Sequence, residues 1–95
     1  MSTVLSPPEV DLALEKLPGW KRRDNAIERI LQFADFVAAM KFVNQVADAA
    51  EAANHHPDIL INYNRVTLTL WSHDSGGVTQ RDLKMADKIS QIAGG

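Results

Sequence analysis

The residues best suited to chemistry are the three histidines, His55, His56 and His73, which all lie between residues 51 and 82. Histidine is the only side chain whose unperturbed pKa, ~6.5, lies near neutrality, so it can donate or accept a proton there. Glu51 precedes His55 by four residues, and Asp82 follows His73. If a helix persists to His55, the spacing puts Glu51 on the same face, where it could hold an imidazole in one tautomer. Imidazoles and carboxylates in this pattern indicate acid–base catalysis or ligand binding.

The same residues also have purely structural explanations. A histidine at the C-terminus of a helix interacts favourably with the helix dipole, so His55-His56-Pro57 could simply end a helix. Asp82 occupies the position that a helix capping box would fill. Imidazoles and carboxylates suit zinc as well, but the histidine spacing matches no zinc motif and the chain has no cysteine. We therefore expect no metal ion.

Composition indicates one globular domain spanning residues 1–95. Hydrophobic residues make up 45% of the chain and charged residues 23%, with a formal net charge of −2. A chain of this length has a small core, so its stability can depend on oligomerisation. Basic residues are spread along the chain, which argues against a nucleic-acid-binding face. No stretch approaches ~18 consecutive apolar residues and the N-terminus lacks a signal-peptide pattern, so we expect no membrane segment and a cytoplasmic location.

The first half of the chain predicts a helix, two strands and a long helix. An S-x-x-E capping box starts an apolar helical stripe over residues 6–17, which ends at Pro-Gly. Strands are expected at 20–23 and 26–33, joined by an Asp-Asn turn. An apolar stripe of helical period then runs over 35–54, and Pro57 prevents its continuation.

The second half predicts a hairpin and a final helix. Strands at 59–63 and 65–72 alternate in polarity on either side of Asn64, and a T-x-x-D capping box opens a helix over 79–93. By strand parity, His73 leaves the apolar face and stands at an open end of the sheet. The order α-β-β-α-β-β-α predicts an α+β fold, a four-stranded antiparallel sheet with three helices packed on one face. A helix ending at His55 and a strand ending near His73 can meet at one rim of that sheet and form a pocket.

Several residues of this stretch follow one another at a specific spacing: Glu51, His55, His56, Pro57, Tyr63, His73 and Asp82. This spacing resembles the signature of the pterin-4a-carbinolamine dehydratases, also called 4a-hydroxytetrahydrobiopterin dehydratases. The resemblance extends to residues 17–20 and 33–42, so it covers nearly the whole chain, and Trp71 before Ser72-His73 resembles bacterial-type members.

The resemblance implies both a reaction and an architecture. Members of the family remove water from a 4a-hydroxytetrahydropterin and give the quinonoid dihydropterin, which recycles the cofactor of aromatic amino-acid hydroxylases. They use no metal or organic cofactor. The family fold is a four-stranded antiparallel sheet with three helices, assembled as homodimers or homotetramers.

The resemblance also implies roles for individual residues. His55 and His73 would be the acid–base pair, and His56 would bind the pterin and share the proton transfer. Asp82 would orient an imidazole or bind the pterin ring. Imidazole suits this work because the leaving hydroxide needs a proton while another proton leaves the ring, both near neutral pH.

Three further residues are expected to support the substrate site. Trp20 and Trp71 are candidates for the pocket wall, and Glu51 for support behind a histidine. An alternative function is that of an interaction module, because animal members of the family also act as dimerisation cofactors of a transcription factor. In this chain the long helix would have to supply that surface.

Overall fold

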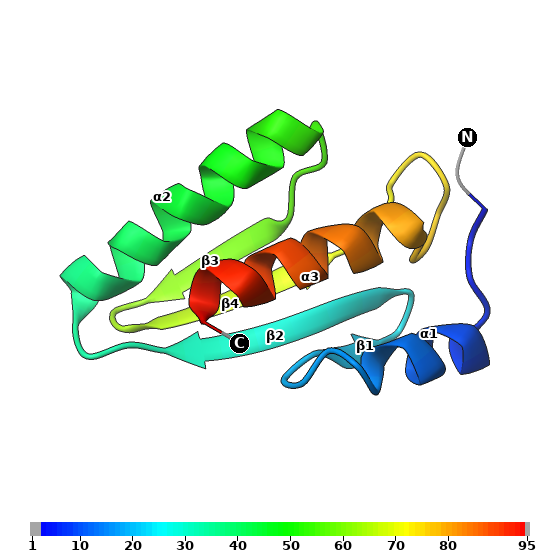
Figure 1. Ribbon diagram of the computed structural model, residues 1–95, viewed down its shortest axis with the longest axis horizontal. Coiled ribbons are helices and arrows are strands. Elements are labelled where there is room, and N and C mark those ends of the chain that lie inside the picture. The colour runs from blue at the N-terminus through cyan, green and yellow to red at the C-terminus, as the bar shows by residue number, and fades with distance from the viewer. Residues whose placement is uncertain (1–2, 95) are drawn as a thin grey trace.

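The computed structural model describes residues 3–94 and confirms the predicted order of elements (Figure 1). The elements are α1 (Pro7–Leu14), β1 (Lys21–Arg23), β2 (Ala26–Gln32), α2 (Phe36–Ala53), β3 (Asp58–Asn62), β4 (Arg65–Leu70) and α3 (Gln80–Ala93). All four strands pair antiparallel in one sheet, in the order β1-β2-β4-β3. The predicted α+β class is therefore confirmed. None of the helices within residues 3–94 has both the length and the apolar character that crossing a bilayer requires.

The core forms between one face of the sheet and the helices. Val66, Leu68 and Leu70 alternate along β4 and have no exposed surface, because their side chains point to the helix side. They share one cluster with Val46 of α2 and Ile89 of α3, which are also fully buried. Figure 1 shows α2 and α3 running across the sheet and α1 beside β1. Burying this apolar surface fixes how the two long helices sit on the sheet.

The two ends of α2 are set by local sequence signals. The Asp35 side chain accepts a hydrogen bond from the Ala38 backbone N–H at 2.8 Å and so caps the first turn. At the other end Asn54 adopts the left-handed conformation with φ 51°, which terminates the helix as predicted. Because the helical path stops at Asn54, His55 and His56 project from a turn rather than from a helix face.

Helix α3 begins with the predicted capping box, formed by Thr79 and Asp82. Gly94, with φ 87°, ends the helix, and Gly95 lies outside the described residues together with Met1 and Ser2. β4 ends at Leu70, but an isolated bridge between Ser72 and Gly77 extends the pairing into the next loop. This bridge holds the loop beside the first turn of α3.

Two details differ from or sharpen the predictions. α1 ends at Leu14 rather than near residue 17, because the backbone N–H of Leu17 bonds to the Leu14 carbonyl and tightens the chain into turns. β1 begins at Lys21 and leaves Trp20 outside the sheet. Because β1 pairs only with residues 26–28, no strand within residues 3–94 pairs with that side of β2 beyond them.

Candidate active site

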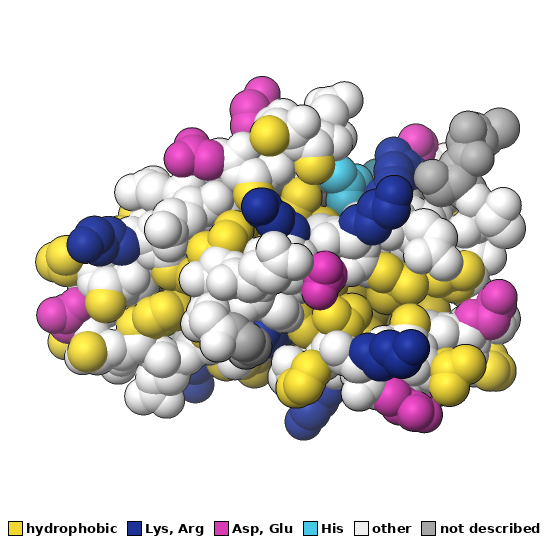
Figure 2. Space-filling view, in the orientation of Figure 1, with side chains coloured by type: hydrophobic (Ala, Val, Ile, Leu, Met, Phe, Trp, Pro, Cys, Tyr) yellow, Lys and Arg dark blue, Asp and Glu magenta, His cyan; other side chains and the backbone are white. Residues whose placement is uncertain are grey.

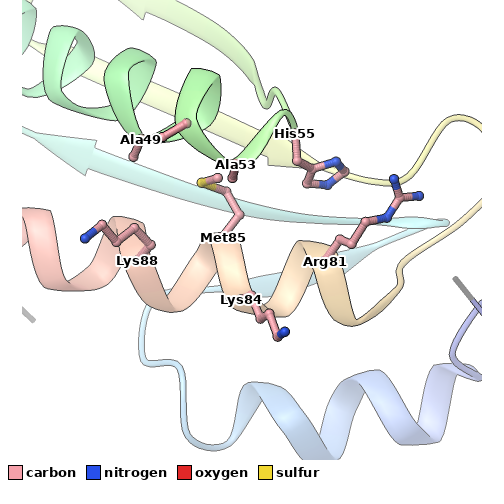
Figure 3. A pocket seen from close by; sticks show the side chains of 8 residues that line it. Ala49, Ala53, His55, Arg81, Lys84, Met85 and Lys88 are labelled. Atoms are coloured by element: carbon pink, nitrogen blue, oxygen red, sulfur yellow. The ribbon is translucent and has the colours of Figure 1, made fainter.

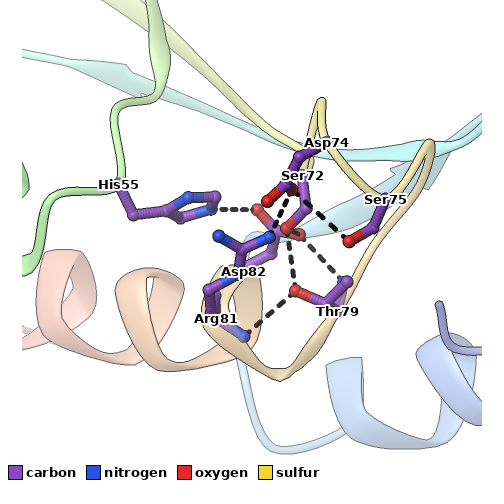
Figure 4. A network of polar contacts seen from close by, with 7 residues as sticks. All are labelled: His55, Ser72, Asp74, Ser75, Thr79, Arg81 and Asp82. Atoms are coloured by element: carbon purple, nitrogen blue, oxygen red, sulfur yellow. Dashed lines mark hydrogen bonds and ion pairs between the residues drawn. The ribbon is translucent and has the colours of Figure 1, made fainter. Parts of the chain in front are cut away.

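Three segments far apart in sequence meet at one rim of the sheet. The turn after α2 brings His55, the end of β4 brings Ser72, and the first turn of α3 brings Asp82. Figure 4 shows the His55 ring extending toward the Asp82 carboxylate, with Ser72 and Thr79 on the other side. The predicted meeting of a helix end and a strand end is therefore present in the structure.

Asp82 is the centre of this polar network and has no exposed surface. Its Oδ2 atom accepts hydrogen bonds from the Thr79 backbone N–H and the Ser72 hydroxyl, both at 2.9 Å. Its Oδ1 atom lies 2.5 Å from Nε2 of His55. An ionised carboxylate accepts hydrogen bonds and donates none, so the two donors on Oδ2 match a carboxylate anion. The capping role and the histidine contact thus use different oxygens of one side chain.

The contact with Asp82 fixes the tautomer that fits His55. A donor facing the carboxylate places the imidazole proton on Nε2, which leaves Nδ1 as the acceptor in the neutral ring. Only 11% of the His55 side chain is exposed, so the ring is held rather than freely rotating. Thr79 Oγ1 lies 2.8 Å from Ser72 Oγ and supports the hydroxyl that donates to Asp82.

A second histidine–carboxylate pair joins His56 to Glu51, with Nε2 and Oε2 2.9 Å apart. Both side chains are exposed, at 56% and 82%. A helical face shared by Glu51 and His55 required the helix to persist to His55, and this condition is not met, because the left-handed Asn54 ends the helix before His55. Glu51 thus orients the neighbouring histidine instead.

His73 packs against Trp71 at the end of β4. The two ring centroids are 3.9 Å apart and the planes are inclined by 31°. Both residues line an open cavity of about 430 Å³, which we call the histidine cavity. Its lining residues are Asn54, His55, His56, Pro57, Asp58, Trp71, His73 and Asp74. All three histidines therefore border one space, whose size lies in the range of small-molecule sites.

Trp20 does not lie at this cavity. Its side chain belongs to the core, only 4% of the residue is exposed, and its indole N–H donates to the Ser90 hydroxyl at 3.2 Å. Trp20 directly precedes β1, and its ring packs in the core beside α3. The expectation that Trp20 forms the pocket wall is therefore not supported.

The sequence reasoning missed Ser72 and Arg81. Ser72 is 1% exposed and shares strand parity with the buried Leu68 and Leu70. A hydroxyl at such an inward-facing position needs a hydrogen-bond partner, and this need could have indicated a polar network from sequence. Arg81 Nη2 lies 2.5 Å from Asp74 Oδ1 and ties the loop after β4 to α3. That hydrogen bond with Arg81 holds the pKa of the Asp74 carboxyl below its usual value.

The family is shown by comparison with known proteins. The model of the pterin 4 alpha carbinolamine dehydratase family matches residues 3–92, and the chain belongs to this family. A protein of Koribacter versatilis is 62% identical over 92 residues, covering 97% of this chain and 98% of its own length. One of Acidobacterium capsulatum is 52% identical over 88 residues, covering 93% and 96%. Both names provisionally assign these relatives to pterin-4-alpha-carbinolamine dehydratase.

One solved structure agrees with this assignment, and a second shares the fold. The crystal structure of a transcriptional coactivator/pterin dehydratase from Brucella melitensis superposes with a TM-score of 0.91 at 43% identity, covering 96% of this chain and 99% of that chain. A pterin dehydratase-like protein described as a RuBisCO assembly factor in the alpha-carboxysome has a TM-score of 0.65 at 18% identity, covering 79% of this chain and 87% of that chain. The second comparison shows a shared fold only.

Proposed function

We propose that the protein dehydrates a 4a-hydroxytetrahydropterin to the quinonoid dihydropterin, with the histidine cavity as the active site. The family supports pterin carbinolamine dehydratase activity, a lyase reaction. The observation that carries the proposal is the buried Asp82, which accepts hydrogen bonds from Ser72 and Thr79 and holds His55 beside a cavity that His56 and His73 also line. A histidine that merely ended a helix would need no such support.

The reaction requires two proton transfers near neutral pH. The C4a–O bond breaks as the oxygen receives a proton and leaves as water, and the N5 proton is lost to a base. The ring then carries the C4a=N5 double bond, and no oxidant or reductant is consumed. Positioned acids and bases typically accelerate such steps ~10²–10⁴-fold.

His55 is suited to accept the N5 proton. Asp82 holds its Nε2–H, so Nδ1 is the free acceptor, and the carboxylate stabilises the imidazolium that forms. His73 would donate to the leaving oxygen, and the Trp71 ring 3.9 Å away holds its imidazole at the wall of the cavity. His56, more exposed, would bind the pterin and share the proton work, and Trp71 would contact the ring system.

The test is the dehydratase assay on wild type and His73→Ala. His73 is exposed, so its removal leaves the core intact, and we expect the variant to stay folded while its rate falls by at least ~10²-fold. Wild-type activity in the folded variant would end the assignment. In that case the interaction-module function would become the stronger hypothesis.

Two further expectations belong to the proposal. The reaction would recycle the pterin cofactor of aromatic amino-acid hydroxylases, which a coupled assay with such a hydroxylase measures. Assembly as a homodimer or homotetramer stays a prediction, and light scattering of the purified protein measures it.

A further inference from the structure

A second cavity adjoins His55, and neither Trp71 nor His73 lines it. It has a volume of about 390 Å³ and lies between α2 and α3, and we call it the helix groove. Its lining residues are Ala49, Ala52, Ala53, His55, Arg81, Lys84, Met85 and Lys88. Figure 3 shows His55 and Arg81 at one end, Met85 between the helices and Lys88 farther along α3. His55 is the residue that lines both this groove and the histidine cavity.

The groove combines an apolar floor with basic walls. Alanine side chains of α2 and Met85 of α3 supply the floor. Arg81, Lys84 and Lys88 follow at i, i+3 and i+7, so they occupy one side of α3, and none of the lining residues is acidic. Figure 2 shows basic side chains and histidine around apolar surface in this region. The chain as a whole carries a formal charge of −2, so this positive charge is local.

The lysines of the groove are available for a ligand. Within residues 3–94, neither Lys84 nor Lys88 forms an ion pair or a side-chain hydrogen bond. Arg81 uses Nη2 to bind Asp74, whereas its Nε is buried without a hydrogen-bond partner. A buried donor without an acceptor is uncommon in folded proteins, but this atom exposes almost no surface, so the charge open to a ligand is that of Lys84 and Lys88.

We propose that the helix groove binds an anionic substituent, a phosphate ester or a carboxylate, at the end of the pterin side chain. The inference rests on the proposed function, because it needs the pterin ring in the histidine cavity. His55 lines both spaces, so a molecule that passes over the edge of its ring would place the pterin against the histidines and its side chain along the alanines and Met85. The anion then meets Lys84 and Lys88, with charge-assisted hydrogen bonds.

The experiment compares three pterins that share one ring and one carbon chain but end in a hydroxyl, a phosphate ester or a carboxylate. Their dissociation constants are measured by calorimetry at low salt for wild type and for Lys84→Gln/Lys88→Gln. Hydrogen bonds to charged groups predict that wild type binds at least one anionic pterin about tenfold more tightly than the neutral one. The double variant should lose this preference and bind the neutral pterin as wild type does. The stronger of the two anionic ligands identifies phosphate or carboxylate as the group recognised.

A matched control separates the groove from general electrostatics. Lys21→Gln/Lys41→Gln removes the same charge from two exposed lysines outside the groove, and it should keep the preference. Equal affinity of wild type for all three pterins would overturn the groove proposal. So would a preference that the groove variant retains, or a groove variant that changes only the oligomeric state, which would make the groove an interface between copies.

The proposed function is judged by a different readout in the same proteins. Dehydration of the neutral 4a-hydroxytetrahydropterin tests the histidine cavity alone, and Lys84→Gln/Lys88→Gln should leave that rate within about twofold of wild type. If wild type fails to dehydrate this substrate, the proposed function fails. If it succeeds without any anion preference, only the groove proposal fails.

Discussion

Within residues 3–94, two imidazole–carboxylate pairs lie at adjacent histidines, and their environments are opposite. In the His55–Asp82 pair the atoms are 2.5 Å apart, with 11% of the histidine side chain and none of the carboxylate exposed. In the His56–Glu51 pair they are 2.9 Å apart, with 56% and 82% exposed. The same two functional groups are thus presented once in the protein interior and once in solvent.

The difference shows that the further hydrogen bonds and the burial of each carboxylate decide how firmly it holds its histidine. Asp82 receives two further hydrogen bonds, from Ser72 and from the Thr79 backbone, which compensate for its burial. Glu51 has solvent around it, so water competes with His56 and salt screens the attraction. The buried pair should therefore hold one geometry, whereas the exposed pair contributes little to stability.

Removing the buried carboxylate should have the largest effect. Asp82→Ala removes the N3 partner of the capping box, with Thr79 left as the N-cap, and leaves the Thr79 backbone N–H and the His55 ring without their acceptor. We expect the free energy of unfolding to fall by about 3 kcal/mol, measured by urea denaturation. Asp87→Ala is the matched control on the same helix, since Asp87 is exposed, and it should cost less than about 0.5 kcal/mol. Equal losses in the two variants would contradict the role given to the network.

Removing one supporting donor should have an intermediate effect. Ser72→Ala removes a buried hydroxyl that donates a hydrogen bond to Asp82 and contacts the Thr79 hydroxyl. The expected loss is about 1–2 kcal/mol in the free energy of unfolding. Chemical denaturation measures it, and a variant as stable as wild type would show that Asp82 does not need this donor.

Weakening the exposed pair should have the smallest effect on stability. Glu51→Gln removes the charge beside His56 but keeps the length of the side chain. The free energy of unfolding should change by less than about 0.5 kcal/mol, and less still at high salt. A destabilisation approaching that of Asp82→Ala would remove the distinction between the two pairs.

Much of the fold could be predicted from sequence because its signals are local. The capping boxes at Ser6 and Thr79, the helix end at Asn54 and the alternation along β4 each depend on neighbours in sequence. The end of α1 could not be placed, since the turns that follow it are shaped by the burial of Leu17.

The site was predicted less completely because its contacts cross the fold. The gathering of the histidines followed from element order, but the partner of Glu51 depended on the backbone direction after Asn54. Trp20 could not be assigned to core or pocket without knowing how the chain enters β1. Asp82 has a capping role that is visible in sequence and a contact with His55 that only the folded chain reveals.

The central claim is that proton transfer by His55 depends on the Asp82 carboxylate of the buried pair, whereas the Glu51 carboxylate of the exposed pair is dispensable. It is tested most directly by the turnover rates of Asp82→Asn and Glu51→Gln in the dehydratase assay, since both replace a carboxylate by its amide. An amide nitrogen facing His55 would reverse the imidazole tautomer, so Asp82→Asn should lose at least ~10²-fold, whereas Glu51→Gln should stay within about threefold of wild type. Equal losses, or a larger loss in Glu51→Gln, would contradict the account.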